Sequence, residues 1–185
     1  MNLWLSLLYD LFTMRFRPKV SWQDVGKRTF RVWPSDLDIF RHMNNGVFLS
    51  LLDLGRYDLS MRAGIWQQWN KLGWYPVVVA ETITFRKSLM PWQKFVLESK
   101  VIGSDEQAVY FEQRFVVGGE IYTKAIVRIR FLKRSHGIVT PAEVLAQLGG
   151  WQGTPPVLPE WIKHWAEQTA LPKGKEEAPS LWHEA

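Results

Sequence analysis

Hydrophobic and polar residues alternate with a period of two in the middle of the chain, as is typical of strands with one buried face. The alternation falls into four segments, at residues 77–87, 92–102, 109–117 and 121–131. Gly118 and Gly119 form a two-residue hairpin signal between the last two segments, and residues 103–106 have the composition of a turn. The pattern predicts a four-stranded antiparallel meander.

A strand and a long helix are expected before this meander. Residues 29–33 alternate as a strand, which Pro34 ends. Residues 47–61 are apolar around much of the helical circumference and predict a buried helix of about 18 residues, with Asn44 or Asn45 as its N-cap. Gly55 costs this helix about 1 kcal/mol in propensity and indicates close approach of another backbone. Because a helix buried on most sides needs a sheet that curves around it, we predict an α+β domain.

The two ends of the chain differ from this middle part. Residues 2–12 are strongly apolar, but the stretch is interrupted by Asp10 and is shorter than the about 20 residues that span a bilayer. The basic residues follow the apolar stretch, whereas in a signal peptide they precede it. Two interpretations remain open: an amphipathic helix docked on this domain or on a second subunit, and a peripheral contact of residues 2–17 with the inner membrane of a cytoplasmic protein.

A C-terminal extension follows the predicted core. Thr140 and Pro141 are typical of the start of a short helix, and a second, aromatic segment lies at residues 161–166 before a tail rich in Lys, Glu and Pro. We expect that tail to be mobile. The chain is therefore divided into an N-terminal helix at residues 1–20, a core domain at 21–140 and a C-terminal helical extension with a mobile tail at 141–185.

Composition narrows the chemistry. The 23 Lys and Arg residues exceed the 18 Asp and Glu residues, for a net charge of +5, but they are spread along the chain, so we expect no nucleic-acid binding. The chain has no Cys and four scattered His residues, which argues against a disulfide scaffold, a cysteine nucleophile and a metal centre, and we expect no cofactor. The sequence has no phosphate-binding glycine loop, zinc-protease helix or nucleophilic serine elbow. The 11 Trp residues indicate interfaces as well as a core.

One segment resembles a known family. Residues 33–45 read WPSDLDIFRHMNN, and Phe48, Asp53 and Arg56 follow. This is similar to the signature of hotdog-fold acyl-CoA thioesterases, in particular the 4-hydroxybenzoyl-CoA thioesterase-like branch. Its members have a strand, Asp-x-Asp, a short loop with a glycine, His-x-Asn-Asn, and then an aromatic residue and an acid on a helix.

The resemblance covers about residues 28–133 and implies the hotdog fold, a long central helix wrapped by a curved antiparallel sheet. It also implies an acyl-CoA or other acyl-thioester substrate, hydrolysed to the free acid and CoA. The implied assembly is a homodimer, or a homotetramer built as a dimer of dimers, because hotdog sites are typically shared by two subunits.

The resemblance also implies roles for residues of the motif. Asp38, the second acid of the pair, would be the base or the nucleophile, and free amides at the helix start, from Asn45 to Phe48, would form the oxyanion hole. Asn45 would lie near the thioester, although its role as an N-cap is equally compatible. His42 would orient the loop or bind substrate, with a purely structural role as the alternative, and Asp36 is expected to form a turn.

Further residues are candidates for binding the substrate, namely Asn44, Gly46, Asp53, Arg41, Glu81, Arg86 and Lys87. Asp53 stands where a related hotdog branch carries its catalytic acid, but an ion pair with Arg56 is the simpler account. Glu81 shares an apolar strand face, so it either neighbours the site or is exposed at an edge. Arg86, Lys87 and Lys94 would contact CoA phosphates.

Arg41 departs from the family, because many members have a glycine before the His. This cation would narrow the acyl pocket, contact a CoA phosphate or indicate weak catalysis. Together with the apolar N-terminus it keeps open a second function, a non-catalytic module that binds an acyl group or acyl-CoA at a membrane or a protein partner. A hotdog hydratase is disfavoured, because its Asp-x-Asn-Pro-x-His motif is absent.

Overall fold

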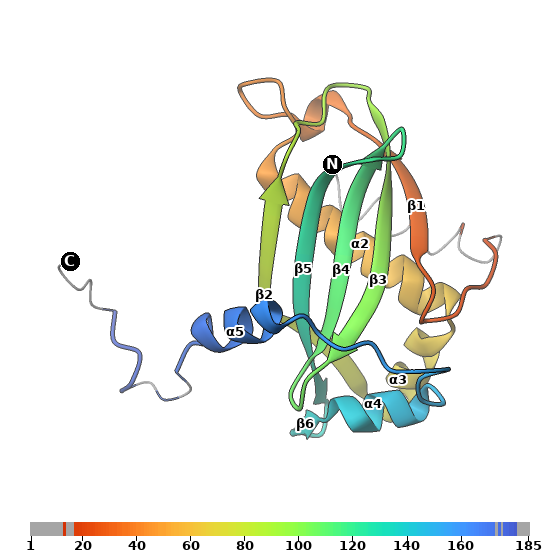
Figure 1. The fold of residues 1–185 in the computed structure, drawn as a ribbon, viewed down its shortest axis with the longest axis vertical. Coiled ribbons are helices and arrows are strands. Elements are labelled where there is room, and N and C mark those ends of the chain that lie inside the picture. Colours follow the sequence, from red (N-terminus) through yellow and green to blue (C-terminus); the bar gives the residue numbers. More distant parts are fainter. Residues whose placement is uncertain (1–12, 14–16, 173, 175, 181–185) are drawn as a thin grey trace.

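The computed structural model describes residue 13, residues 17–172, residue 174 and residues 176–180. The helix expected in residues 1–20 therefore lies almost wholly outside the described residues. A single curved sheet dominates the described part, with one long helix lying along one of its faces (Figure 1). This is the α+β hotdog arrangement that the sequence predicted.

The sheet is antiparallel throughout and runs in the order β1-β3-β4-β5-β2, with a short β6 beside β5. Its strands are β1 (Gly26–Arg31), β2 (Trp74–Phe85), β3 (Lys94–Ser104), β4 (Val109–Val117), β5 (Glu120–Lys133) and β6 (Ile138–Val139). The hairpin at Gly118 and Gly119 is confirmed, since Val117 pairs with Glu120 across it.

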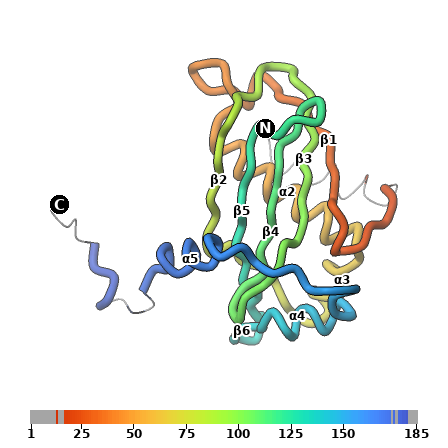
Figure 2. Tube along the Cα trace, viewed as in Figure 1, coloured from red at the N-terminus to blue at the C-terminus, as the bar shows by residue number. Residues whose placement is uncertain are grey.

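The predicted four-stranded meander is wrong in one respect. Only β3, β4 and β5 form a meander, because β2 pairs with β5 at one edge while β3 pairs with β1. The reason lies in residues 86–93, which are too long for a tight hairpin and contain Pro91 and the buried Leu89. This segment carries the chain across the end of the sheet, as the traces in Figures 1 and 2 show.

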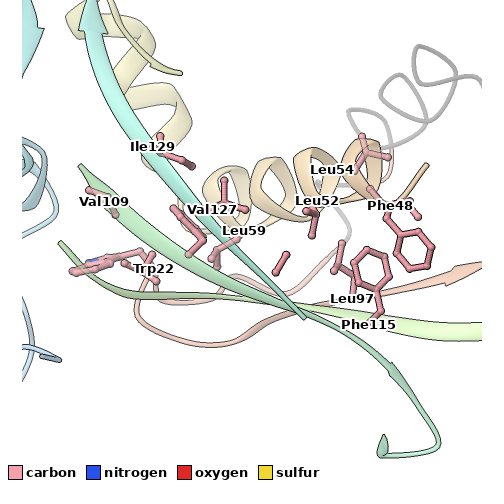
Figure 3. Close-up of a cluster of buried hydrophobic side chains, with 14 of the residues drawn as sticks. Trp22, Phe48, Leu52, Leu54, Leu59, Leu97, Val109, Phe115, Val127 and Ile129 are labelled. Atoms are coloured by element: carbon pink, nitrogen blue, oxygen red, sulfur yellow. The ribbon is translucent and has the colours of Figure 1, made fainter. Parts of the chain in front are cut away.

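The long helix α2 (Asn45–Arg62) has 18 residues, and its N-cap is Asn44, whose side chain accepts a hydrogen bond from the amide of Gly46 at 2.8 Å. Its apolar side chains pack on the inner face of the sheet, where Phe48, Leu52 and Leu59 point toward side chains of the strands (Figure 3). Burying about 80 Å² or more of each such side chain is the main stabilising term of the domain.

Gly55 lies at the closest approach of α2 to the sheet. A Cβ atom there would stand 2.7 Å from the Leu97 Cδ2 and Ser99 Oγ atoms and 2.9 Å from the Gln113 Nε2 atom. The close contact that the sequence predicted is therefore real, but it is made with side chains of β3 and β4 and not with a backbone.

Three shorter helices complete the described fold: α3 (Ile65–Leu72), α4 (Pro141–Gln147) and α5 (Glu160–Gln168). Thr140 caps α4 as expected, in a reciprocal capping box with Glu143. α5 lies on the outer face of the sheet, opposite α2, where Ile162 and Ala166 pack on Tyr110 and Ile126 (Figure 1).

The three-part division of the chain stays a prediction. No helix formed by the described residues combines the length and the hydropathy needed to cross a bilayer.

Candidate active site

The motif segment forms the loop between β1 and α2, and Asp36 fixes its base. A single 3-10 turn, η2 (Pro34–Asp36), opens the loop. The buried Asp36 carboxylate accepts the amide of Trp33 at 2.9 Å, and its carbonyl oxygen accepts the amide of Asn44 at 2.8 Å. Asp36 is thus the turn former that the sequence predicted, and it ties the loop to the start of α2.

Asp38 organises a tight turn over residues 37–43, which we call the Asp38 turn. Leu37 and Met43 form an antiparallel bridge at its base, and the Asp38 amide donates to the His42 carbonyl oxygen at 2.8 Å. The Oδ1 atom of Asp38 accepts the amides of Phe40 at 2.8 Å and His42 at 3.1 Å. Its Oδ2 atom accepts no hydrogen bond from the described residues. One carboxylate oxygen is therefore anchored and the other is available.

The backbone of this turn accounts for the glycine that many relatives have before the His. Arg41 has a φ of 62°, in the left-handed region that disfavours every residue with a Cβ atom. Arg41 accepts this conformation at a cost of about 1 kcal/mol, and its exposed side chain forms no ion pair with the described residues. The departure from the family pattern therefore leaves the turn intact.

The start of α2 offers fewer free amides than the sequence suggested. The Gly46 amide is bonded to the Asn44 side chain, and the Val47 amide donates to the Asn44 carbonyl oxygen at 2.9 Å. Asn44 therefore already accepts both of these amides, and the oxyanion hole at the helix start stays a prediction. The Asn45 amide has no partner among the described residues, and the Asn45 side chain is exposed rather than capping.

Two of the predicted phosphate ligands are already engaged. Arg86 and Lys87, in the loop between β2 and β3, both bind the Glu120 carboxylate, Lys87 Nζ at 2.9 Å from each of its oxygen atoms. These hydrogen bonds from Lys87 and then Arg86 lower the pKa of Glu120. Lys94, by contrast, forms no ion pair with the described residues.

Asp53 lies about two turns beyond the helix start, at the half-exposed end of a polar cluster that is otherwise buried. It pairs with Arg56, the simpler account that the sequence offered. The buried Arg56 guanidinium also donates to the Gln113 Oε1 atom at 2.6 Å, and Gln113 in turn donates to the Leu52 carbonyl oxygen and the Ser99 hydroxyl at 2.9 and 2.8 Å. Burial lowers the pKa of Arg56, while Asp53 and then Glu81 oppose that shift.

A shallow apolar cleft opens beside this cluster, between α2, α3 and strands β2, β4 and β5. Asp53 and Arg56 stand in its wall together with aromatic and aliphatic side chains, which include Tyr57, Trp66, Trp69, Val78, Phe111 and Phe131. Glu81 lies on the inner face of β2, opposite Val127, where its side chain is only partly covered. This partial burial raises the pKa of Glu81, and burial likewise raises that of Tyr57.

The loop thus gathers Asp38, Arg41, His42, Asn44, Asn45 and Gly46, while Asp53 and Glu81 belong to the cleft region. The sequence missed Gln113, although a polar residue at an inward position between Phe111 and Phe115 was a usable signal. Within the described residues no three His, Asp or Glu side chains are grouped closely enough to hold a metal ion.

Comparison with known proteins gives consistent matches. The model of the thioesterase-like superfamily matches residues 32–166. Protein THEM6 of Xenopus laevis is 33% identical over 135 residues, which is 72% of this chain and 63% of that protein, so the match spans less than two thirds of this relative.

Solved structures share the fold at low identity. The YbaW probable thioesterase from Escherichia coli superposes with a TM-score of 0.62 at 17% identity, over 66% of this chain and 94% of that one. The BH1999 gentisyl-coenzyme A thioesterase does so with a TM-score of 0.57 at 13% identity, over 64% and 98%.

Proposed function

The chain belongs to the thioesterase-like superfamily, and from that premise we propose that it is an acyl-CoA thioesterase, which hydrolyses a thioester to the free acid and CoA. The observation that carries the proposal is the Asp38 carboxylate, with Oδ1 anchored by two amides and Oδ2 free of donors from the described residues. The gentisyl-coenzyme A thioesterase among the fold neighbours supports CoA as the thiol.

In the proposed reaction, Asp38 Oδ2 takes a proton from a water molecule as the water oxygen attacks the carbonyl carbon of the thioester. The negative charge moves to the former carbonyl oxygen, which the Asn45 amide and the positive end of α2 stabilise. The C–S bond then breaks, and the CoA thiolate recovers the proton from Asp38. Alternatively, Oδ2 attacks the carbon itself and the C–S bond breaks, so that the CoA thiolate leaves and an anhydride remains on Asp38. Water then cleaves the anhydride to the free acid and the Asp38 carboxylate, and the thiolate takes up the proton that is released.

His42 is proposed to position the substrate. It lies opposite Asp38 across the turn, where its amide donates to Oδ1, and its ring makes no hydrogen bond with the described residues. Arg86 and Lys87 are weak candidates for binding the CoA phosphates, because both already bind the Glu120 carboxylate.

We further propose that the working unit is a homodimer. β2 is an edge strand of the sheet, and its exposed apolar residues include Tyr75, Val78, Val79 and Phe85. An edge with unpaired backbone groups and apolar side chains is suited to pairing with a second copy. A dimer formed there would cover the mouth of the apolar cleft, which Val78 helps to line.

The test is hydrolysis of short, medium, long and aromatic acyl-CoA substrates by the wild type and by Asp38→Asn. The asparagine keeps an oxygen that can accept the Phe40 and His42 amides, so it preserves the turn and removes the base. We expect turnover of at least one class by the wild type and a loss of about 10²–10⁴-fold in the variant. Tight binding of acyl-CoA without turnover would support the binding-module alternative and overturn the proposal.

A further inference from the structure

Two loops meet at one end of the molecule and expose five large apolar side chains. Trp33, Ile39 and Phe40 come from the loop before α2, and Met90 and Trp92 come from the loop between β2 and β3. The loops are joined by backbone hydrogen bonds from Trp92 to Val32 and from Met43 to Leu89, at 2.9 and 3.0 Å. We call the five residues the apolar tip. Both loops lie at the upper end of the molecule in Figures 1 and 2.

The apolar tip protrudes rather than packs. Ile39 is 90% exposed and Phe40 is 72% exposed, and both directly precede the left-handed backbone of Arg41. Trp33 and Trp92 stand edge to face, with ring centroids 5.5 Å apart, and each remains about half exposed. Large apolar groups gathered on a surface in this way mark a contact with an apolar partner.

Cations without acidic partners border the apolar tip. Arg31 and Lys94 are directly opposite each other on β1 and β3, and Arg31 also donates to the Trp92 carbonyl oxygen at 3.2 Å. Neither forms an ion pair with the described residues, and Arg41 adds a third cation next to Phe40. Like charges placed opposite each other in a sheet are unfavourable unless an anion lies between them. The pair therefore fits phosphate groups beside an apolar layer.

We propose that the apolar tip docks on a lipid bilayer surface that carries anionic headgroups, with Ile39, Phe40 and the two tryptophans in the interfacial layer and Arg31, Lys94 and Arg41 on headgroup phosphates. Tryptophan and basic residues are the residues that this layer prefers. A second copy of the chain is the competing occupant, and the first experiment below distinguishes it from a bilayer. The five residues of the apolar tip are not among residues 2–17, and the proposal does not rest on thioester hydrolysis.

The first experiment uses the absence of cysteine in this chain. A single Phe40→Cys substitution is labelled with an environment-sensitive fluorophore, and Val157→Cys, at an equally exposed apolar position elsewhere, is the matched control. With vesicles of phosphatidylcholine and phosphatidylserine, the label at position 40 is expected to shift to the blue and brighten, and the label at position 157 to stay unchanged. A label at position 40 that remains in water overturns the proposal, whether or not the protein sediments with the vesicles.

A shift of the same label that depends on protein concentration and needs no vesicles identifies a second copy as the occupant, and this also overturns the proposal.

The second experiment tests the charges. The double variant Arg31→Gln with Lys94→Gln is expected to weaken sedimentation with anionic vesicles by about fivefold or more per charge, and Lys71→Gln with Lys100→Gln is the control of equal charge. If the first pair weakens only the binding of free CoA, the cations serve that phosphate source and the membrane assignment is wrong.

Discussion

Asp38 and Asp53 lie in one continuous loop–helix segment, yet the fold holds their carboxylates in opposite ways. Asp38 is fixed by backbone amides and has no cation beside it among the described ion pairs, whereas Asp53 is paired with the buried Arg56. Amides orient a carboxylate and leave its full charge in place, but a guanidinium neutralises it. The first arrangement suits an acid that must accept a proton, and the second suits an acid that keeps a buried arginine in place.

The largest expected effect separates the two acids by activity. Because Asp53 is paired with Arg56 and Asp38 has no such ion pair among the described residues, Asp38→Asn should lower kcat/KM for the best acyl-CoA substrate by about 10²–10⁴-fold, while Asp53→Asn should stay within about tenfold of the wild type. Thermal unfolding of both variants checks that each is folded. Equal losses in the two variants would mean that the helix acid takes part in the chemistry.

The second effect tests whether the Asp53 cluster is structural. Arg56→Met removes the donor to Gln113 and leaves the buried Oε1 atom of that side chain without a partner, so the free energy of unfolding should fall by about 2–4 kcal/mol. Arg114→Met is the control, because its ion pair with Glu112 lies on the outer face with Arg114 about half exposed, and it should cost less than about 1 kcal/mol. Equal destabilisation in urea titrations would contradict the structural role of the cluster.

The third effect concerns the turn that holds Asp38. Arg41→Gly relieves the left-handed backbone and should raise the free energy of unfolding by about 0.5–1 kcal/mol, the gain being reduced by the freedom that glycine adds to the unfolded chain. Lys100→Gly, in the middle of β3, should lower it by a similar amount. If Arg41→Gly destabilises the protein, the arginine side chain makes a stabilising contact that outweighs its backbone strain.

The smallest effect is a dependence of stability on pH through Glu81. Burial raises its folded-state pKa above the ordinary value of 4.5, so its contribution favours the folded state fully below that value and is lost as the pH rises through the raised pKa. The melting temperature of the wild type minus that of Glu81→Gln should therefore be higher at pH 4 than at pH 7. Glu106→Gln, at an exposed position away from the cleft, should show no such trend. A constant or reversed difference for Glu81→Gln refutes the shift.

Local features of the fold were predictable from sequence because they depend on neighbouring residues. The length of α2 and the capping by Asn44 and Thr140 follow from residues within one or two turns. The partner of β2 was not predictable, since the alternating pattern defines a buried face and contains no information on which strand lies beside it.

The same division applies to the candidate site. The motif identified the loop and the turn role of Asp36, but the occupied amides of Gly46 and Val47 depend on how Asn44 is oriented, which spacing does not reveal. Arg41 could be seen as unusual, yet only its φ shows why a glycine is preferred there. Gln113 joins Arg56 across 57 positions in the chain, a distance over which local pattern carries no information.

The placement of β1 and β2 at the two edges of the sheet has a consequence for folding kinetics. Hairpins β3–β4 and β4–β5 join residues close in sequence, such as Val117 and Glu120, whereas the edges require contacts as remote as Gly26 with Ser99 and Trp74 with Lys133. Because long loops close slowly, we expect the central hairpins to form in the folding nucleus and both edges to join after it. The loops that carry Asp38 and Trp92 would then be ordered last, so destabilising substitutions in them should accelerate unfolding and leave the folding rate nearly unchanged.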